Sequence, residues 1–399
     1  MRVVIAGIDG YLGWPLALHL AERGHDVAGF DALLRREWVE IEGGESALPI
    51  LDMEGRLKAA REHGLNIRFL KCDTRDYDLT HAFLRQERPD VVVHLAENPS
   101  APHSMIDVDH AVMVHENNVI GSLKLLYAMK SACPSAHLLK LGSMGEYGTP
   151  NIDIPEGFFE LEFRGRRERL PFPRLPNSMC HLTKVHDSHN IHFACRAWGM
   201  RATDIMQGVV FGSRIDAMQG DPRLNTRFDI DQSFGTVINR FCAQAAAAHP
   251  LTLYGPGNQR LGFLPLRDSV QCFTLAIEHP PEPYAYRVFN QFQEHHSVGE
   301  LARLVQSAGA RIGLPVDIRQ VENPRFEASD HHYNPDHQKL IDLGYAPTTD
   351  VEQEIEATLT DLRPYADRIR CFSNVLIPDI HWAGERRRAR YLDDHLSVG

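Results

Sequence analysis

The sequence lacks the features that mark membrane-spanning and secreted proteins. It has no uninterrupted apolar run of about 18 residues, which is the length that a spanning helix needs. The N-terminus enters an apolar strand at once, without a charged segment followed by the apolar core of a signal peptide. The 7 cysteines are scattered and have no CxxC spacing, which is typical of free thiols in a reducing compartment. We therefore expect a cytoplasmic protein.

Positive charge is also scarce. The chain has 42 Lys and Arg against 53 Asp and Glu, a net charge of −11 at pH 7. This balance argues against an extended nucleic-acid surface but leaves room for a small basic pocket. The sequence contains neither an internal repeat nor a low-complexity tract. At 399 residues, 43% hydrophobic and 24% charged, it fits a globular protein with one large core or two modest ones.

The N-terminus does contain an ordered pattern of strand, glycine turn, helix and strand. Residues 2–6 form a compact apolar run of the kind found in buried parallel strands. A turn with Gly7, Gly10 and Gly13 follows and leads into an apolar helical stripe. The next apolar strand ends in Asp31. This order predicts a dinucleotide-binding unit.

Each residue of this turn has a physical reason to be there. Gly7 permits the tight turn, Gly10 lets the backbone approach a pyrophosphate, and Gly13 allows close packing of helix on strand. The N–H groups at the start of the helix then bind the phosphates. Asp31 would accept hydrogen bonds from ribose hydroxyls and repel a 2′-phosphate, so NAD is favoured over NADP. Arg35 could hold a 2′-phosphate or stack on adenine, and we retain NAD.

Further apolar strands alternate with helical segments through the first half of the chain. This alternation predicts an α/β fold with a Rossmann-type, doubly wound parallel sheet and right-handed crossovers. The expected strands cover residues 66–71, 89–96, 136–142 and 201–206, and a helix covers much of 108–130.

The regularity ends at about residue 208, where Gly, Pro and charged loops interrupt shorter elements. We expect an NAD-binding Rossmann domain over residues 1–207, with a long insertion at 32–65 that has its own helix. Residues 208–399 are expected to form mainly a smaller substrate-binding region, with some segments returning to the sheet.

The candidate catalytic residues lie near the predicted ligand edge of the sheet. Ser143 comes just beyond the strand at 136–142. Cys180 and Lys184 are one helical turn apart and share a face. The charge of Lys184 would lower the pKa of the Cys180 thiol from about 8.5 toward neutrality, which would let it exchange a proton with a sugar hydroxyl. Alternatively, Cys180 is a small filler. In that case the candidates for proton transfer are His181, His103 and Glu146.

Two other groups of side chains have competing interpretations. His186, His189 and His192 lie three residues apart and lack the i,i+4 pair of a zinc helix, so we expect surface or interface histidines and no metal. Isolated arginines in the second half would suit a nucleotide diphosphate, which needs bidentate cations, unless they lie on the surface. These are Arg260, Arg267 and Arg325.

Several long stretches resemble a known family. The chain is similar over nearly its full length to the extended short-chain dehydrogenases that act on nucleotide sugars, and within them to the UDP-sulfoquinovose synthases. The stretches that carry the resemblance are residues 10–14, 104–107, 117–121, 140–154, 184–190, 201–204 and 288–292.

The resemblance implies an enzyme that recycles a tightly held NAD within one turnover and works as a homodimer on a nucleotide sugar. It assigns NAD binding to Gly7, Gly10, Gly13, Asp31, Arg35, Asp73, Asn118 and Lys184. It implies that Ser143 contacts the reacting hydroxyl. It places around the nucleotide sugar Gln207, Thr236, Arg260, Arg267 and Arg325.

The chain departs from this family at two places. Cys180 stands where the family has the tyrosine of its Tyr-x-x-x-Lys motif. In addition, Pro99 and His103 stand where the sulfoquinovose synthases have an arginine and a tyrosine. An arginine in an active-site loop is a plausible holder for sulfite, so its loss weakens the prediction of sulfite transfer.

Three functions remain as hypotheses. The leading one is an NAD-dependent nucleotide-sugar epimerase (an isomerase) of antibiotic biosynthesis, such as a GDP-octose 6-epimerase. It would oxidise a sugar hydroxyl transiently and return the hydride. The alternative is a UDP-sulfoquinovose synthase that uses UDP-glucose and sulfite. The third is a catalytically dead NAD-binding regulatory protein, suggested by the missing tyrosine.

Overall fold

A seven-stranded sheet forms the centre of the fold, and every neighbouring pair of its strands is parallel. The structure, a computed structural model, describes residues 1–328 and 331–392. In sheet order the strands are β12 (Tyr286–Gln291), β8 (Arg201–Gln207), β5 (His137–Ser143), β4 (Val91–His94), β1 (Arg2–Ala6), β2 (Asp26–Asp31) and β3 (Ile67–Lys71). The predicted α/β class with a doubly wound parallel sheet is confirmed.

The direction of winding reverses at β1, which has β2 on one side and β4 on the other. A reversal of this kind opens a crevice at the carboxyl ends of the strands. The glycine turn follows β1 at this point, so the fold brings the turn to the edge where ligands bind.

Helices cover both faces of the sheet because successive residues of a strand point to opposite sides. Val3, Ile5 and Val93 pack against α1 (Gly13–Glu22), α3 (Met53–Glu62) and α9 (Leu266–Glu278). Val4 and Val92 pack on the other face against α4 (Tyr77–Glu87), α6 (Gly121–Ala132) and α7 (Met179–Trp198).

The helix predicted over residues 108–130 is interrupted in the structure. A π-helical turn, Glu116–Ile120, separates α5 (Val108–His115) from α6. Asn117 and Asn118 in this turn are buried. Turns of this kind are frequent at functional sites because they redirect side chains within a helix.

The long insertion at 32–65 contains α2 (Leu34–Ile41) and α3, and Asp9 of the glycine turn anchors it. The Asp9 carboxylate pairs with Arg36 at 2.7 Å and with Arg56 at 2.9 Å. Arg56 is fully buried and also donates to the carbonyl of Asn225 at 2.9 Å. The insertion therefore ties the glycine turn to the second half of the chain.

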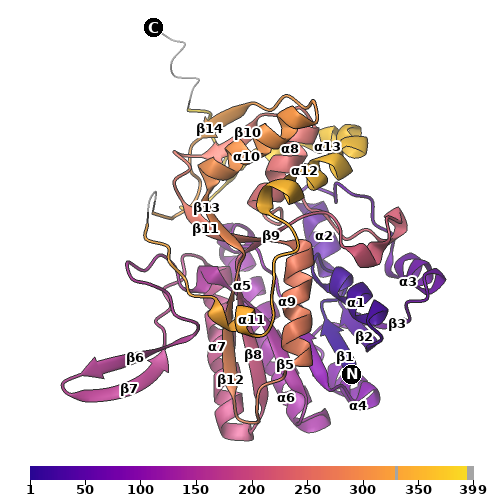
Figure 1. Cartoon of the computed structure of the whole chain (residues 1–399), viewed down its shortest axis with the longest axis vertical. Coiled ribbons are helices and arrows are strands. Elements are labelled where there is room, and N and C mark those ends of the chain that lie inside the picture. Colours follow the sequence, from indigo (N-terminus) through magenta and orange to yellow (C-terminus); the bar gives the residue numbers. More distant parts are fainter. Residues whose placement is uncertain (329–330, 393–399) are drawn as a thin grey trace.

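Most residues beyond 208 build a second region above the carboxyl edge of the main sheet (Figure 1). It contains the pair β10 (Leu251–Tyr254) and β14 (Ile318–Val321), and the three-stranded sheet β13 (Glu294–Ser297), β11 (Arg260–Pro265) and β9 (Val209–Phe211). Helices α8 (Val237–Ala246), α10 (Val298–Arg311), α12 (Val351–Leu362) and α13 (Ala366–Cys371) enclose a core of their own. Because α9 packs on the main sheet and β12 is one of its strands, the chain passes between the two regions more than once.

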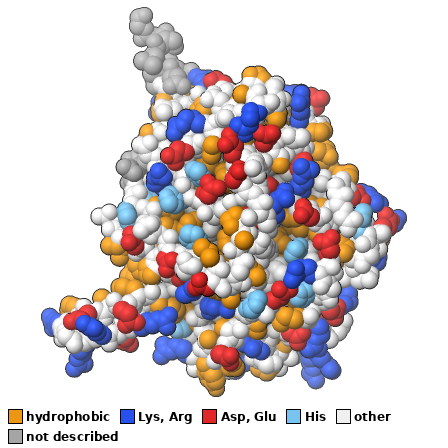
Figure 2. Space-filling view, in the orientation of Figure 1, with side chains coloured by type: hydrophobic (Ala, Val, Ile, Leu, Met, Phe, Trp, Pro, Cys, Tyr) orange, Lys and Arg blue, Asp and Glu red, His pale blue; other side chains and the backbone are white. Residues whose placement is uncertain are grey.

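The remaining elements are short or lie outside the two cores. The hairpin β6 (Phe158–Phe163) and β7 (Arg166–Pro171) projects from the body (Figure 1). The others are α11 (Gln338–Asp342), β15 (Ile380–His381) and β16 (Glu385–Arg386). Basic and acidic side chains are intermixed on the face shown in Figure 2. Within residues 1–328 and 331–392, no helix has the length and apolar character to cross a membrane.

Candidate active site

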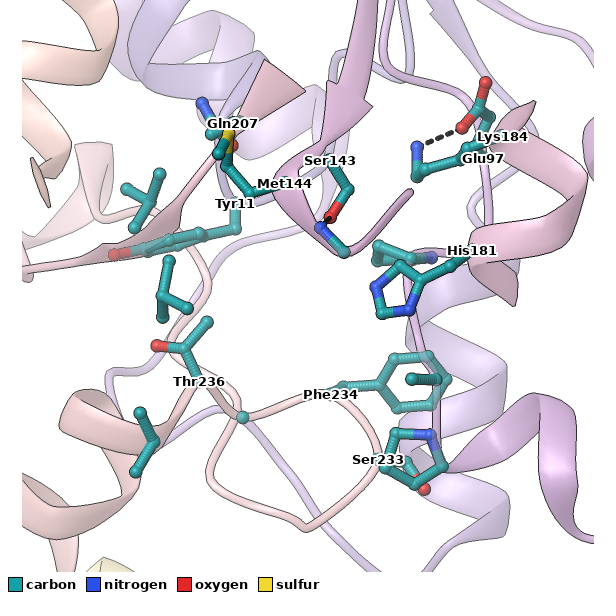
Figure 3. A pocket seen from close by; sticks show the side chains of 18 of the residues that line it. Tyr11, Glu97, Ser143, Met144, His181, Lys184, Gln207, Ser233, Phe234 and Thr236 are labelled. Carbon is teal, nitrogen blue, oxygen red and sulfur yellow. Dashed lines mark hydrogen bonds and ion pairs between the residues drawn. The ribbon is translucent and has the colours of Figure 1, made fainter. Parts of the chain in front are cut away.

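A cavity of about 480 Å³ is lined by both regions of the molecule (Figure 3). The main sheet contributes the glycine turn, the segments after β4 and β5, and the first turns of α7. The second region contributes residues 232–237 and 325–328. This volume lies in the range of about 300–1,000 Å³ that small-molecule sites occupy.

The glycine turn is shaped for close backbone approach. Gly7 has φ +89°, and a Cβ there would lie 2.6 Å from the carbonyl carbon of Leu95. A Cβ on Gly13 would lie 2.2 Å from the carbonyl oxygen of Gly7. Neither position accepts a side chain, and the turn presents bare backbone N–H groups to the cavity at the start of α1. That surface fits a pyrophosphate.

Asp31 and Arg35 both line the cavity, but only one of them is free to select the ribose. Asp31 accepts from the backbone N–H of Asp9 at 3.0 Å and of Leu33 at 2.7 Å. Burial and then the nearby Asp9 raise the pKa of its carboxyl to about 6. Arg35 is paired with Asp229 at 2.8 Å and so is not available to a 2′-phosphate. The site therefore fits NAD better than NADP.

Two other residues predicted to hold NAD are placed differently from each other. Asp73 lines the cavity, and its carboxylate is paired with Arg75 at 2.7 Å. Asn118 is fully buried and accepts from the backbone N–H of Asn98 at 2.8 Å. Asn118 thus holds the loop after β4, while its neighbour Asn117 reaches the cavity wall.

Lys184 reaches the cavity from α7 and is held by two acceptors. Its Nζ forms an ion pair with Glu97 and donates to the carbonyl of Leu141 at 2.9 Å (Figure 3). Glu97 follows the end of β4, and Leu141 belongs to β5. The ammonium group is therefore fixed between two strand ends.

Ser143 ends β5 and also lines the cavity. Its Oγ accepts from the backbone N–H of Gly145 at 3.0 Å, and its own N–H donates to Glu146 at 3.0 Å. Glu146 is fully buried and pairs with Arg174 at 2.6 Å and Lys140 at 3.2 Å. Glu146, a predicted candidate for proton transfer, thus braces the turn that carries Ser143 and does not line the cavity.

Cys180 lies beneath the cavity wall rather than on it. The residue is fully buried, and its thiol donates to the carbonyl of Asn98 at 3.3 Å. Burial raises the pKa of the thiol to about 12, and the opposing effect of Lys184 does not overcome this. The thiolate that the sequence suggested is therefore disfavoured, and this geometry gives Cys180 no path to a substrate.

His181, the next residue, is the imidazole that does face the cavity (Figure 3). Its ring packs on the turn after β5, since a Cβ on Gly145 would lie 2.4 Å from Nε2. Its Nδ1 is 3.0 Å from the Oγ of Ser178. Burial first, and then Lys184 and Arg325, lower the pKa of His181 to about 4. The ring is therefore neutral, and one of its two nitrogens carries a free lone pair.

His103 turns away from the cavity. Its Nδ1 is 3.2 Å from the amide nitrogen of Asn98, and its ring centroid is 4.9 Å from that of His110. In the described part of the chain, the one group with metal-ligand spacing is Glu42, His103 and His110, whose candidate atoms lie within 4.8 Å of one another. Arg386 is 2.7 Å from the Glu42 carboxylate, so a fixed cation already neutralises this group.

The structure separates the residues predicted for the nucleotide sugar into two sets. Gln207, Thr236 and Arg325 line the cavity. Arg260 pairs with Glu300 at 3.6 Å and Arg267 with Glu354 at 3.1 Å, and neither is part of the wall. Gln207, Thr236 and Arg325 are therefore in a position to contact a nucleotide sugar in the cavity, whereas the two paired arginines are not.

Several wall residues were missed from the sequence. Glu97 directly follows a predicted strand, a position that marks ligand-edge residues. Tyr254 and Trp382 flank Arg325, whose guanidinium carbon lies 5.4 Å and 5.8 Å from their ring centroids. Trp382 carried no sequence signal, because it lies far along the chain from every motif.

The placement of Cys180 predicts how the thiols react. In the native protein, a thiol reagent should rapidly modify Cys371, the exposed cysteine, and leave Cys180 unreacted because it is buried as a neutral thiol. Counting modified thiols with Ellman's reagent, before and after denaturation, measures this. The Cys371→Ser variant should lose the fast phase. A fast phase that instead disappears in Cys180→Ala would contradict the geometry.

Comparison with known proteins places this geometry in a family. Residues 3–290 match the model of the NAD dependent epimerase/dehydratase family. The chain is 45% identical over 384 residues to the chloroplastic UDP-sulfoquinovose synthase of Spinacia oleracea, covering 96% of this chain and 79% of the relative. It is 43% identical to the UDP-sulfoquinovose synthase of Sulfolobus acidocaldarius, covering 96% and 98%.

Solved structures of low sequence identity share the fold. The UDP-glucuronic acid 4-epimerase of Bacillus cereus, in complex with UDP-glucuronic acid and NAD, has a TM-score of 0.69 at 18% identity and covers 91% of this chain and 99% of that one. The UDP-glucose 4-epimerase of Thermus thermophilus, in complex with NAD, has a TM-score of 0.64 at 22% identity and covers 91% and 99%. By the family match and these relatives, the cofactor is NAD, and the protein is an enzyme of the short-chain dehydrogenase/reductase superfamily. The chain belongs to the NAD-dependent epimerase/dehydratase family.

Proposed function

We propose that this enzyme oxidises a hydroxyl of a UDP-linked sugar at bound NAD and returns the hydride within the same turnover, with His181 as the proton acceptor. The observation that supports this is the convergence of Ser143, His181 and Lys184 on one wall of the cavity, next to the glycine turn (Figure 3). When bound, NAD supplies the hydride acceptor, and the chain supplies orientation and proton transfer.

The proton acceptor is the Nε2 atom of His181. The Oγ of Ser178 accepts from the backbone N–H of His181 at 3.2 Å and can also accept the Nδ1 proton. That tautomer leaves the Nε2 lone pair toward the turn that carries Ser143. The Ser143 hydroxyl orients the reacting sugar hydroxyl. The proton of the sugar hydroxyl moves to Nε2 of His181 and returns to the sugar when the hydride returns. The fixed charge of Lys184 lies beside them and favours developing alkoxide.

The relatives support the second of the sequence hypotheses better than the first. The relatives from Spinacia oleracea and Sulfolobus acidocaldarius are both UDP-sulfoquinovose synthases, and each aligns with 96% of this chain. We therefore take sulfite addition to a UDP-glucose-derived sugar as the first assignment to test. Membership in an enzyme family leaves the hypothesis of a dead regulatory protein without support.

One observation favours epimerisation as the second candidate. Pro99 and Ala101 line the cavity. Pro99 stands at the position where the resemblance to sulfoquinovose synthases implies an arginine. The cations at that end, Lys184 and Arg35, are already paired with Glu97 and Asp229. Epimerisation adds no external anion, so it needs no free cation there. The antibiotic-sugar form of this reaction, a GDP-octose 6-epimerase, belongs to this candidate.

Parallel incubations distinguish the two reactions. UDP-glucose with NAD and sulfite should give a UDP-sulfosugar if the first assignment holds, measured by mass spectrometry. If the enzyme is an epimerase, deuterated water without sulfite should yield sugar with inverted stereochemistry, with GDP-octose tested beside UDP-sugars. No sulfosugar and an epimerised product would reject the first assignment. Neither product with any of these sugars would reject both.

A substitution of His181 tests the proton acceptor. His181→Asn should lower kcat by about 10²–10⁴-fold because the proton loses its acceptor, while NAD binding survives. His189→Asn, an exposed position on the same helix, is the matched control and should keep wild-type turnover. Steady-state kinetics and NAD titration measure both. Wild-type kcat in His181→Asn would contradict the assignment.

We also propose a homodimer that forms through α5 and α7, which pack side by side. Val108 and Val112 on α5 are 71% and 51% exposed, and Phe193 on α7 is 62% exposed, so this surface carries apolar side chains. The 7 free cysteines support a reducing compartment such as the cytoplasm.

Sedimentation velocity tests the assembly. The wild-type protein should sediment with the mass of two chains, and Val112→Glu should sediment as one chain because it buries a charge in the interface. Leu79→Glu, which changes an exposed apolar residue on α4, should remain dimeric. A single-chain mass for the wild type would remove the proposal.

A further inference from the structure

A buried cluster of charged side chains lies behind the wall that carries Ser143 and Lys184. It contains three cations, Lys140, Arg174 and Lys184, and four carboxyl groups, Glu97, Glu146, Asp187 and Asp204. Of the carboxyl groups, Glu146, Asp187 and Asp204 are fully buried, and the side chain of Glu97 is 3% exposed. The cluster therefore holds one more acid than base, and its carboxyl groups are almost entirely buried.

Three of the four carboxyl groups have cationic partners. Glu146 pairs with Arg174 at 2.6 Å and with Lys140 at 3.2 Å. Asp204 lies 3.5 Å from Lys140 and accepts from Tyr286 at 2.6 Å. Glu97 pairs with Lys184 through Oε2. These pairs use all three cations of the cluster.

Asp187 is the carboxyl group without such a partner. Within the described residues, neither of its oxygens accepts a hydrogen bond, although the side chain is fully buried. A buried carboxylate without a donor is strongly unfavourable, so the group must bind a proton. With that proton the cluster carries three positive and three negative charges.

Glu97 offers the acceptor for that proton. Its Oε1 is buried and has no hydrogen-bond donor among the described residues. The Nε2 of His94 is 3.6 Å away and lies 2.8 Å from the Oγ of Ser122. Asp187 lies three residues after Lys184 on α7 and hence on the same face, and its carboxyl group interacts with that of Glu97. One oxygen of Glu97 thus faces Lys184, and the other is open to Asp187.

We propose that Asp187 is a protonated acid that donates to Oε1 of Glu97, and that this acid–carboxylate pair positions Lys184 at the cavity. One proton is shared between two carboxyl groups, and Glu97 remains the single negative charge opposite Lys184. Asp187 and Glu97 are positioning residues, because neither is needed to touch the sugar.

The electrostatics of the surrounding groups agree with this division. Burial first, and then Glu97, raise the pKa of Asp187 far above that of a free carboxyl group, against the opposite effect of Lys140 and Lys184. Burial alone would raise the pKa of Glu97, but Lys184 and Lys140 lower it below its usual value. Burial lowers the pKa of His94 to about 4, so that ring stays neutral and leaves the charge balance unchanged.

Infrared spectroscopy of the whole, substrate-free protein tests the shared proton directly. A protonated carboxyl group has a C=O stretch above the amide band, and a carboxylate does not. Four other buried acids are ionised at about pH 9, because their pKa values are raised only to about 6 for Asp31 and Asp231 and to about 7 for Glu156 and Glu354. At that pH we expect a remaining band from Asp187. Burial also raises the pKa of Asp268, and the Asp187→Asn variant distinguishes these two aspartates.

Isotope labelling assigns the band without any substitution. Carbon-13 in the aspartate side-chain carboxyl should shift it, and the same label in glutamate should leave it in place. The Asp187→Asn variant should lack the band, whereas Asp26→Asn at the surface should retain it. A folded protein with no band, or with a band that follows the glutamate label, overturns the proposal. Because this measurement needs no turnover, its failure is distinguishable from failure of the proposed function.

A kinetic comparison, which rests on the proposed function, tests the positioning role. Asp187→Leu removes the donor to Glu97, and Asp187→Asn restores an N–H donor of similar size. We expect kcat to fall in the Leu variant and to recover in the Asn variant, with KM unchanged in both. Equal kcat in both variants and the wild type would show that the pair does not position Lys184.

Discussion

The charge of Lys184 is the constraint on which the site depends. An ammonium group that is almost fully buried in a cavity wall loses most of its hydration and is stabilised by a neighbouring carboxylate. Glu97 supplies that carboxylate from the end of β4, and the carbonyl of Leu141 in β5 supplies a second acceptor. This junction joins α7 to two strands of the sheet. Ser143 at the end of β5 and His181 on the first turn of α7 lie on the same cavity wall as this junction.

The architecture could be predicted from the sequence because its signals are local. Gly7 adopts a positive φ, Gly13 packs against the carbonyl oxygen of Gly7 a few residues earlier, and the apolar strands carry their own pattern. The π-helical turn at Glu116–Ile120 could not be predicted, because one extra residue within a helix hardly changes the apolar period. The edge strand of the main sheet, Tyr286–Gln291, comes from a late segment of the chain, and its place in the sheet depends on long-range contacts. From the sequence we could expect only that some later segments return to the sheet.

The glycine turn, Ser143 and Lys184 could be predicted as parts of the site, but the sequence left open which residue near Lys184 on the same helix faces the cavity. The spacing of Cys180 and Lys184 identified α7 correctly, but neighbouring residues on a helix point about 100° apart. The start of the helix at Ser178 directs Cys180 inward and His181 toward the cavity. The arginines show the same limit. The carboxylates Glu300 and Glu354, which pair with Arg260 and Arg267, come from segments that no motif connects to them.

We propose that the imidazole of His181, one position along the helix from Cys180, takes over proton transfer while the rest of the NAD-binding frame is retained. The most direct test is a rapid-mixing experiment with NAD-loaded enzyme and its sugar, followed by the near-ultraviolet absorbance of reduced nicotinamide. We expect a transient rise and fall in the wild type, a rise that is nearly abolished in His181→Asn, and a wild-type rise in Cys180→Ala. Loss of the rise in Cys180→Ala, with an unchanged rise in His181→Asn, would contradict the proposal.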